Sequence, residues 1–175
     1  MLQQKIKNVI RDVPDFPKKG IVFKDITPIL HHPKLCAEIV DYFANYYENK
    51  NINAVLGIES RGFLFGFMLA NKLNIPFVLA RKAGKLPYKT ISYEYELEYG
   101  SATIEMQVED IQPGWNVLIH DDLLATGGTA EAAAKLIQMQ NGKVAGFAFI
   151  VTLEFLNGRE KLEKYSPAIL SLVGY

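Results

Sequence analysis

Short apolar runs alternate with helical segments along most of this chain, and this alternation limits the possible folds more than any other feature. The runs at 54–58, 75–80 and 115–120 are almost continuously apolar, as strands buried on both faces of a sheet are. The segments 61–73 and 129–140 have the apolar spacing of helices. The sequence therefore predicts an α/β fold with a mostly parallel central sheet flanked by helices.

The remaining segments extend this pattern. Helical spacing is also present at 2–13, which ends at Pro14, and at 33–50 and 159–165, while strands are predicted at 103–108, 144–151 and 168–173. The segment 90–101 alternates weakly and is typical of an exposed edge hairpin. Ligands bind beyond the carboxyl ends of the strands in such sheets. Functional residues are therefore expected just after Ile58, Ala80 and His120.

Length, charge and cysteine content exclude several classes of protein. The 175 residues fit one domain, at roughly 100–200 residues per domain. The 19 basic and 19 acidic residues cancel, which argues against a nucleic-acid binder. The single cysteine, Cys36, rules out an internal disulfide and fits a reducing compartment. The N-terminal residues lack the apolar core of a signal peptide, and no apolar run approaches the ~18 residues of a membrane span, so we expect a cytoplasmic protein without membrane contact.

The most informative stretch is VLIHDDLLATGGT, residues 117–129. Its apolar strand leads to Asp121 and Asp122, whose carboxylates should point to different sides and could accept hydrogen bonds from sugar hydroxyls. The loop 125–129 then opens a helix. Its two glycines permit close approach of the backbone, and the helix N-terminus favours an anion.

The same stretch lacks the features of other nucleotide sites. No lysine follows the second glycine, as it would in a P-loop, and no G-x-G-x-x-G is present. Carboxylates that could bind sugar hydroxyls lie next to a loop that could bind a single phosphate. This combination suggests that the ligand contains a ribose 5-phosphate. Taken alone, the two acids would more simply be a solvated strand end, and the two glycines a plain turn. The thirteen residues in this order favour a binding site for ribose 5-phosphate.

Two further motifs follow predicted strands. In 57–63 (GIESRGF), Glu59 and Arg61 form either part of an anion loop or a surface ion pair. In 81–89 (RKAGKLPYK), four basic residues occur without an acid. A basic run is commonly a solvated face, but directly after a strand it favours an anion site, as a pyrophosphate leaving group would need.

These motifs resemble those of type I phosphoribosyltransferases, which use phosphoribosyl pyrophosphate (PRPP), and DDLLATGGT resembles the adenine-specific members in particular. The resemblance runs from Phe16 nearly to the C-terminus. It implies one phosphoribosyltransferase domain over 1–175, with a small hood at about 14–30 over the base and a mobile lid at about 81–103. It further implies purine salvage, in which adenine and PRPP give AMP and pyrophosphate, with Mg²⁺ held mainly by PRPP rather than by protein ligands, and a homodimer.

The resemblance also assigns roles to individual residues. It implies phosphate binding by Ala125, Thr126, Gly127, Gly128 and Thr129, ribose binding by Asp121 and Asp122, pyrophosphate binding by Arg61, Arg81, Lys82 and Lys85, and adenine binding by Val22, Phe23, Lys24 and Leu123. The sequence LEYG at 97–100 matches the lid, which makes Glu98 the candidate for handling the purine proton and Tyr99 its support.

The chain departs from the family pattern at one position and leaves two rival functions open. Lys24 stands where arginine is common and lacks the planar arginine fork, so backbone groups near Val22 are expected to recognise the base. A related transferase for hypoxanthine, xanthine or orotate is one rival. The other is a PRPP-sensing regulator without catalysis, which would be expected to carry a DNA-binding appendage or a damaged lid.

Overall fold

The structure is a computed structural model that describes residues 1–97 and 100–175. Its strands are β1 (Arg11–Pro14), β2 (Val22–Asp25), β3 (Ala54–Ile58), β4 (Phe77–Lys82), β5 (Thr90–Glu96), β6 (Ser101–Gln107), β7 (Asn116–Leu124), β8 (Lys143–Thr152) and β9 (Ile169–Gly174). Its helices are α1 (Leu2–Val9), η1 (Thr27–His31), α2 (Pro33–Tyr47), α3 (Gly62–Leu73), α4 (Gly128–Met139), η2 (Glu154–Leu156) and α5 (Gly158–Glu163).

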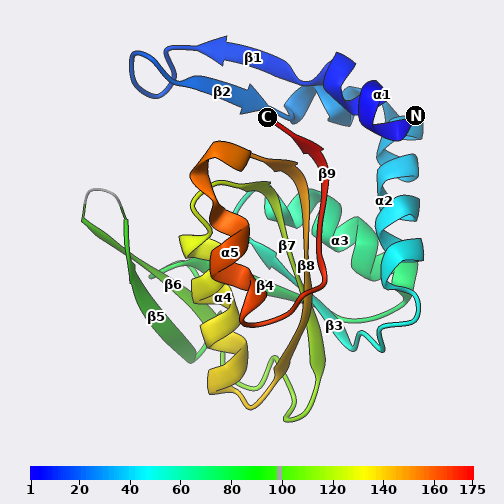
Figure 1. The fold of residues 1–175 in the computed structure, drawn as a ribbon. Helices are drawn as coiled ribbons and strands as arrows, with labels where there is room; N and C mark the ends of the chain where they lie inside the picture. The colour runs from blue at the N-terminus through cyan, green and yellow to red at the C-terminus, as the bar shows by residue number, and fades with distance from the viewer. Residues whose placement is uncertain (98–99) are drawn as a thin grey trace.

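Seven of the described strands form the central sheet, in the order β5-β6-β4-β3-β7-β8-β9 (Figure 1). The five strands from β4 to β9 in that order pair in parallel, while β6 pairs antiparallel with both β4 and β5. Helices α2 and α3 cover one face and α4 and α5 the other (Figure 1). The predicted α/β fold with a mostly parallel sheet is thereby confirmed.

The register of the parallel strands brings three predicted loops to one level. Ile58 pairs with Ala80 in β4, and Gly57 pairs with His120 in β7. The residues that follow these pairs therefore lie at one edge of the sheet, where β3 ends at Ile58 while β4 continues to Lys82 beside β6 and β7 continues to Leu124 beside β8. This is the edge at which functional residues are expected.

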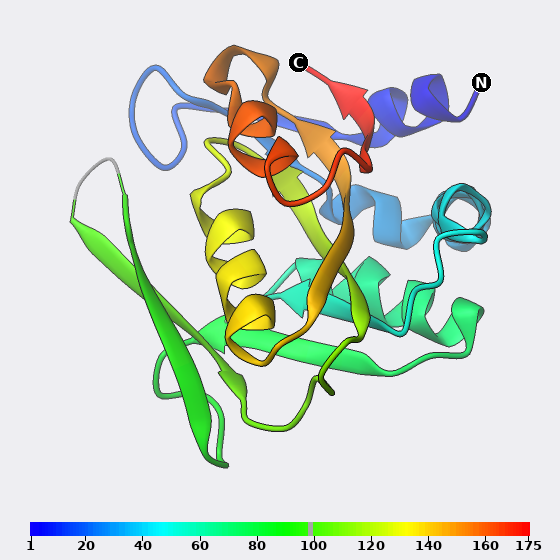
Figure 2. The same cartoon turned by 60° about the horizontal axis from the view of Figure 1, so that its bottom comes forward.

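The edge hairpin formed by β5 and β6 projects from the rest of the molecule (Figure 2). The side chains of Ile91, Tyr93 and Tyr95 alternate with exposed residues and pack against the core beside α4. The weak alternation of apolar and polar residues therefore does correspond to a strand, β5, and one of its faces is partly covered by the core.

The predicted helix at 2–13 is wrong in its second part. Helix α1 ends at Val9, and residues 11–14 form β1, which pairs antiparallel with β2. Arg11 lies opposite Asp25 in this hairpin, with their charged groups 4.0 Å apart. Pairing with β2, whose partner residues lie 8 to 14 positions later in the chain, overrides the helical spacing here.

Cys36 and His120 are both buried in the core. The Cys36 thiol donates a hydrogen bond to the carbonyl of Ile29. The His120 ring packs edge-on against Phe43, and burial lowers its pKa to about 4, so the ring is neutral near pH 7. Within the described ranges, no helix is both long and apolar enough to cross a membrane.

Candidate active site

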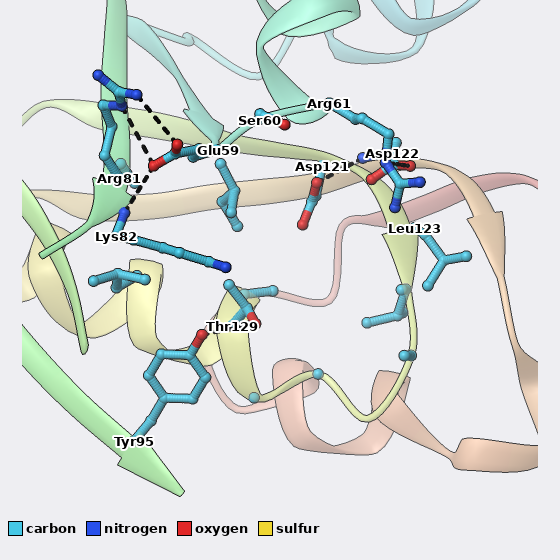
Figure 3. A pocket seen from close by; sticks show the side chains of 18 of the residues that line it. Glu59, Ser60, Arg61, Arg81, Lys82, Tyr95, Asp121, Asp122, Leu123 and Thr129 are labelled. Atoms are coloured by element: carbon cyan, nitrogen blue, oxygen red, sulfur yellow. Dashed lines mark hydrogen bonds and ion pairs between the residues drawn. The ribbon is translucent and has the colours of Figure 1, made fainter. Parts of the chain in front are cut away.

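A cavity of about 630 Å³ lies at the carboxyl ends of β3, β4 and β7 (Figure 3). Ligand pockets commonly have volumes of about 300–1,000 Å³. The lining includes most of the residues singled out in the sequence, namely Arg61, Arg81, Lys82, Lys85, Asp121, Asp122, Leu123 and residues 125–129. The structure therefore brings together motifs that lie more than 60 residues apart in the chain.

The loop at 125–129 joins β7 to α4 along one wall of the cavity. Gly127 has a φ of +82°, a conformation that side chains with a Cβ rarely adopt, and Gly128 begins the helix. The loop is supported from behind, because a Cβ on Gly127 would lie 2.7 Å from the carbonyl oxygen of Gly158. The backbone path of this loop is consequently fixed by close packing against α5.

The two adjacent acids at the end of β7 have different partners. The Asp122 side chain is 5% exposed, and its Oδ2 lies 2.8 Å from Nε of Arg61. Asp121 instead points into the cavity, and its Oδ1 accepts a hydrogen bond from the backbone N–H of Asp122 (Figure 3). Burial raises the pKa of both carboxyls, and the charge of Asp122 raises the pKa of Asp121 further. The side of the Asp121 carboxyl that is not bonded to the Asp122 backbone therefore faces the cavity.

Three of the basic residues surround Glu59 across the cavity. Its Oε1 lies 2.7 Å from Nζ of Lys85 and 3.1 Å from Nη2 of Arg81, and its Oε2 accepts the backbone N–H of Lys82. The alternative prediction, an ion pair between Glu59 and Arg61, is wrong, because Arg61 pairs with Asp122 and Glu59 pairs with Arg81 and Lys85. Burial opposes ionisation of Glu59, but these hydrogen bonds outweigh it and lower its pKa to about 2.

We expect Glu59→Gln to reduce the free energy of unfolding by more at pH 7 than at pH 3. Because the folded-state pKa of Glu59 is lowered, its ionisation stabilises the fold above pH 4.5, and this stabilisation is lost as the pH falls toward 2. The shift corresponds to about 3 kcal/mol at most at pH 7, and less than half of that should remain at pH 3. Urea denaturation at both pH values measures the difference, with the exposed Glu94→Gln as the control. An equal difference at both pH values would contradict this account.

Three of the four residues predicted to bind the base, Val22, Phe23 and Lys24, lie in the hairpin β1–β2 and are absent from the described lining of the cavity, whereas Leu123 in β7 lines it. Phe23 nevertheless lies beside it, because its ring centre is 4.9 Å from the guanidinium of Arg61. The ring of Phe16 meets Phe23 edge-on, and Val22 is half exposed. The hairpin thus presents an aromatic surface next to the ion pair of Arg61.

The amino group of Lys24 is already engaged. Its Nζ lies 2.7 Å from Oδ1 of Asp12 and 4.0 Å from the ring centre of Tyr175, and its side chain is only 13% exposed. The Lys24 side chain therefore ties the hairpin to the residue that follows β9. A head group held in this way is not directed at the cavity.

Comparison with known proteins agrees with the geometry. Residues 25–171 match the phosphoribosyl transferase domain family. An adenine phosphoribosyltransferase of Cytophaga hutchinsonii is 49% identical over 175 residues, which cover all of this chain and 97% of that protein. This chain belongs to the adenine phosphoribosyltransferase family.

Solved structures of adenine phosphoribosyltransferases have the same fold. The crystal structure from Thermoanaerobacter pseudethanolicus has a TM-score of 0.94 and 47% identity, with 99% of each chain covered. The Saccharomyces cerevisiae protein, crystallised with adenine and an imino-altritol bisphosphate, has a TM-score of 0.91 and 39% identity, with 98% of each chain covered. The resemblance inferred from the sequence motifs is confirmed.

Membership in the adenine phosphoribosyltransferase family does not assign the individual residues, whose roles stay predictions. Glu98 and Tyr99 lie outside the residues that the structure describes. Sequence reasoning also missed contributors to the site. Tyr95 lines the cavity, Gly158 supports the loop at 125–129 and Tyr175 contacts Lys24. Of these three, only Tyr95 could have been found from the sequence, because it lies on the apolar side of a segment in which apolar and polar residues alternate.

Proposed function

We propose that the chain transfers the 5-phosphoribosyl group of PRPP to adenine, producing AMP and pyrophosphate. The observation that carries this proposal is one cavity with a phosphate-type loop on one wall, a basic cluster on another and the Asp121 carboxylate between them (Figure 3). PRPP has the matching order of groups, with a phosphate, two ring hydroxyls and a diphosphate. The family's activity and the adenine bound in the Saccharomyces cerevisiae relative support the choice of base.

In this proposal, the residues at 125–129 bind the 5′-phosphate through backbone N–H groups, the Thr hydroxyls and the N-terminus of α4. Asp121 accepts hydrogen bonds from the ribose hydroxyls. Asp122 holds Arg61 at the cavity through their 2.8 Å ion pair. Fixing both anionic ends of PRPP places the anomeric carbon next to the surface formed by Phe23, where adenine would stack.

The reaction breaks the bond between the anomeric carbon and a pyrophosphate oxygen and forms a bond from that carbon to N9 of adenine. Positive charge develops on the ribose, and negative charge develops on the departing pyrophosphate. Arg61, Arg81, Lys82 and Lys85 would stabilise the leaving group. Glu98 would accept the proton that adenine loses near N7 as N9 bonds to the ribose, with Tyr99 as its support, and closure of the lid would exclude water that could hydrolyse PRPP.

We propose that Mg²⁺ enters with PRPP, held by diphosphate oxygens and ribose hydroxyls. The donor set fits this arrangement, because Asp121 offers a carboxylate to hydroxyls or metal-bound water while Glu59 and Asp122 are paired with cations. The described part of the chain holds no group of three or more His, Cys, Asp or Glu side chains that could bind a metal ion. When bound, Mg²⁺ would neutralise charge on the leaving group.

The proposed hood corresponds to the hairpin β1–β2 and its surroundings at about 14–30, and the lid to about 81–103, which includes the hairpin β5–β6. A homodimer is also proposed, and the exposed apolar side chains Leu64, Phe67 and Met68 on one face of α3 offer it a surface. The cytoplasmic location stays a prediction.

The decisive experiment measures formation of nucleotide and pyrophosphate from PRPP with adenine, hypoxanthine, xanthine, guanine and orotate in turn. We expect turnover with adenine at a kcat/KM at least about tenfold above that for any other base. PRPP binding without turnover of any base would instead indicate the sensing regulator. A preference for another base would indicate the related transferase.

Two variants test how the base is selected. Lys24→Ala is expected to keep the preference for adenine over hypoxanthine, because the Lys24 amino group is bound to Asp12 and Tyr175. A backbone carbonyl facing the 6-amino group would reject a 6-oxo base at a cost of about 1–3 kcal/mol per unpaired acceptor. Phe23→Ala should lower kcat/KM for every base, because it removes the stacking surface. If Lys24→Ala erased the preference, the lysine itself would be the recognising group.

A further inference from the structure

Tyr95 joins the edge hairpin to the phosphate loop. Its hydroxyl lies 3.1 Å from Oγ1 of Thr129, the last residue of that loop (Figure 3). Its ring lies close to Gly128, since a Cβ placed there would be 3.5 Å from Cδ2 of Tyr95. The contact joins the loop proposed to bind the 5′-phosphate to the hairpin that contains the predicted lid carboxylate, Glu98.

The direction of this hydrogen bond depends on the phosphate. Either hydroxyl can donate to the other as long as Thr129 has no other acceptor. When Thr129 donates its only proton to a phosphate oxygen, its own oxygen can only accept, so Tyr95 must be the donor. A donated hydrogen bond from Tyr95 would then hold the Thr129 hydroxyl in the orientation that serves the phosphate.

We propose that Tyr95 is a positioning residue that couples binding of the 5′-phosphate to docking of β5. The inference rests on the proposed function of the loop. Tyr95 lies three residues before Glu98, so a phosphate that fixes Thr129 and Tyr95 also fixes the end of the strand leading to the predicted lid carboxylate. By reciprocity, docking of β5 strengthens phosphate binding.

Core packing alone would explain the Tyr95 ring but not a role for its hydroxyl. Tyr93 lies two residues earlier on the same face of β5 and also packs against the core. Replacing either tyrosine with phenylalanine keeps the ring and removes only the hydroxyl. Tyr93→Phe is therefore a matched control for Tyr95→Phe.

Calorimetry with AMP and with adenosine separates the two explanations. We expect Tyr95→Phe to weaken AMP binding about three- to tenfold, the range for one neutral hydrogen bond, and to change adenosine binding less than about twofold. The KM for PRPP should rise by a similar factor while the KM for adenine stays nearly constant. Tyr93→Phe should change none of these values. Unchanged AMP binding in Tyr95→Phe, or an equal loss for adenosine, would overturn the inference.

A double-mutant cycle tests whether Tyr95 acts through Thr129. Thr129→Val removes the hydroxyl at nearly constant volume, and adding Tyr95→Phe to it should weaken AMP binding less than about twofold further. Additive losses would show that Tyr95 acts independently and would overturn the coupling. Wild-type protein that forms no AMP would overturn the proposed function instead, whereas active wild type with an unaffected Tyr95→Phe variant refutes only this inference.

Discussion

Replacing Gly127 with valine is expected to weaken AMP binding by about 100-fold or more while the chain still folds. Gly127 has a φ of +82°, and a Cβ there would lie 2.7 Å from the carbonyl oxygen of Gly158. The loop would have to move away from α5, and the phosphate would lose at least two charge-assisted hydrogen bonds worth about 1.5–3 kcal/mol each. Calorimetry measures the affinity, and circular dichroism checks the fold.

The neighbouring glycine provides the matched control. A Cβ on Gly128 would meet the ring of Tyr95 at 3.5 Å, an ordinary contact, and Gly128 has no left-handed backbone. Gly128→Ala is therefore expected to bind AMP within about threefold of the wild type. Should Gly127→Val fail to fold, Gly127→Ala introduces the same Cβ with less bulk. Normal AMP affinity in a folded Gly127 variant would mean that the phosphate binds elsewhere.

Glu98→Gln is expected to lower kcat by about 10²–10⁴-fold while PRPP affinity stays within about twofold, because a positioned proton-transfer group acts on rate rather than on binding. Single-turnover kinetics should be used, so that product release does not mask the chemical step. Glu94→Gln is the control on the same hairpin, because Glu94 is exposed and accepts a hydrogen bond from Ser101. A near-normal rate of chemistry in Glu98→Gln would show that another carboxylate has this role.

The sheet and its functional edge could be predicted from the sequence because strands that are buried on both faces consist of short, nearly continuous apolar runs. The runs ending near Ile58, Ala80 and His120 are apolar wherever helices cover both sides of the sheet. The loops that follow them line one cavity, as expected from the parallel connection of the strands. This part of the site needs only local patterns and the topology that they imply.

Ion pairs and strand pairs between residues that lie far apart in the sequence could not be predicted in the same way. Glu59 and Arg61 are two residues apart, yet Glu59 pairs with Arg81 and Lys85 while Arg61 pairs with Asp122. Local charge spacing contains no information about which residues from other strands arrive beside them. The prediction of helix at 11–14 was wrong for the same reason, because this segment forms a strand only by pairing with β2.

The contact of Lys24 with Asp12 and Tyr175 has a consequence for the order in which the site matures during synthesis. The hairpin β1–β2 leaves the ribosome early, but Tyr175 reaches it only after β9 has been made, because the Tyr175 backbone is bonded to Thr152 and Glu154 beside that strand. The phosphate loop, the acids and the basic residues all precede β8 in the chain. The support of the loop 125–129 by Gly158 of α5 and the contact of Lys24 with Tyr175 nevertheless form only after β8 has been made, so both ends of the site are braced late.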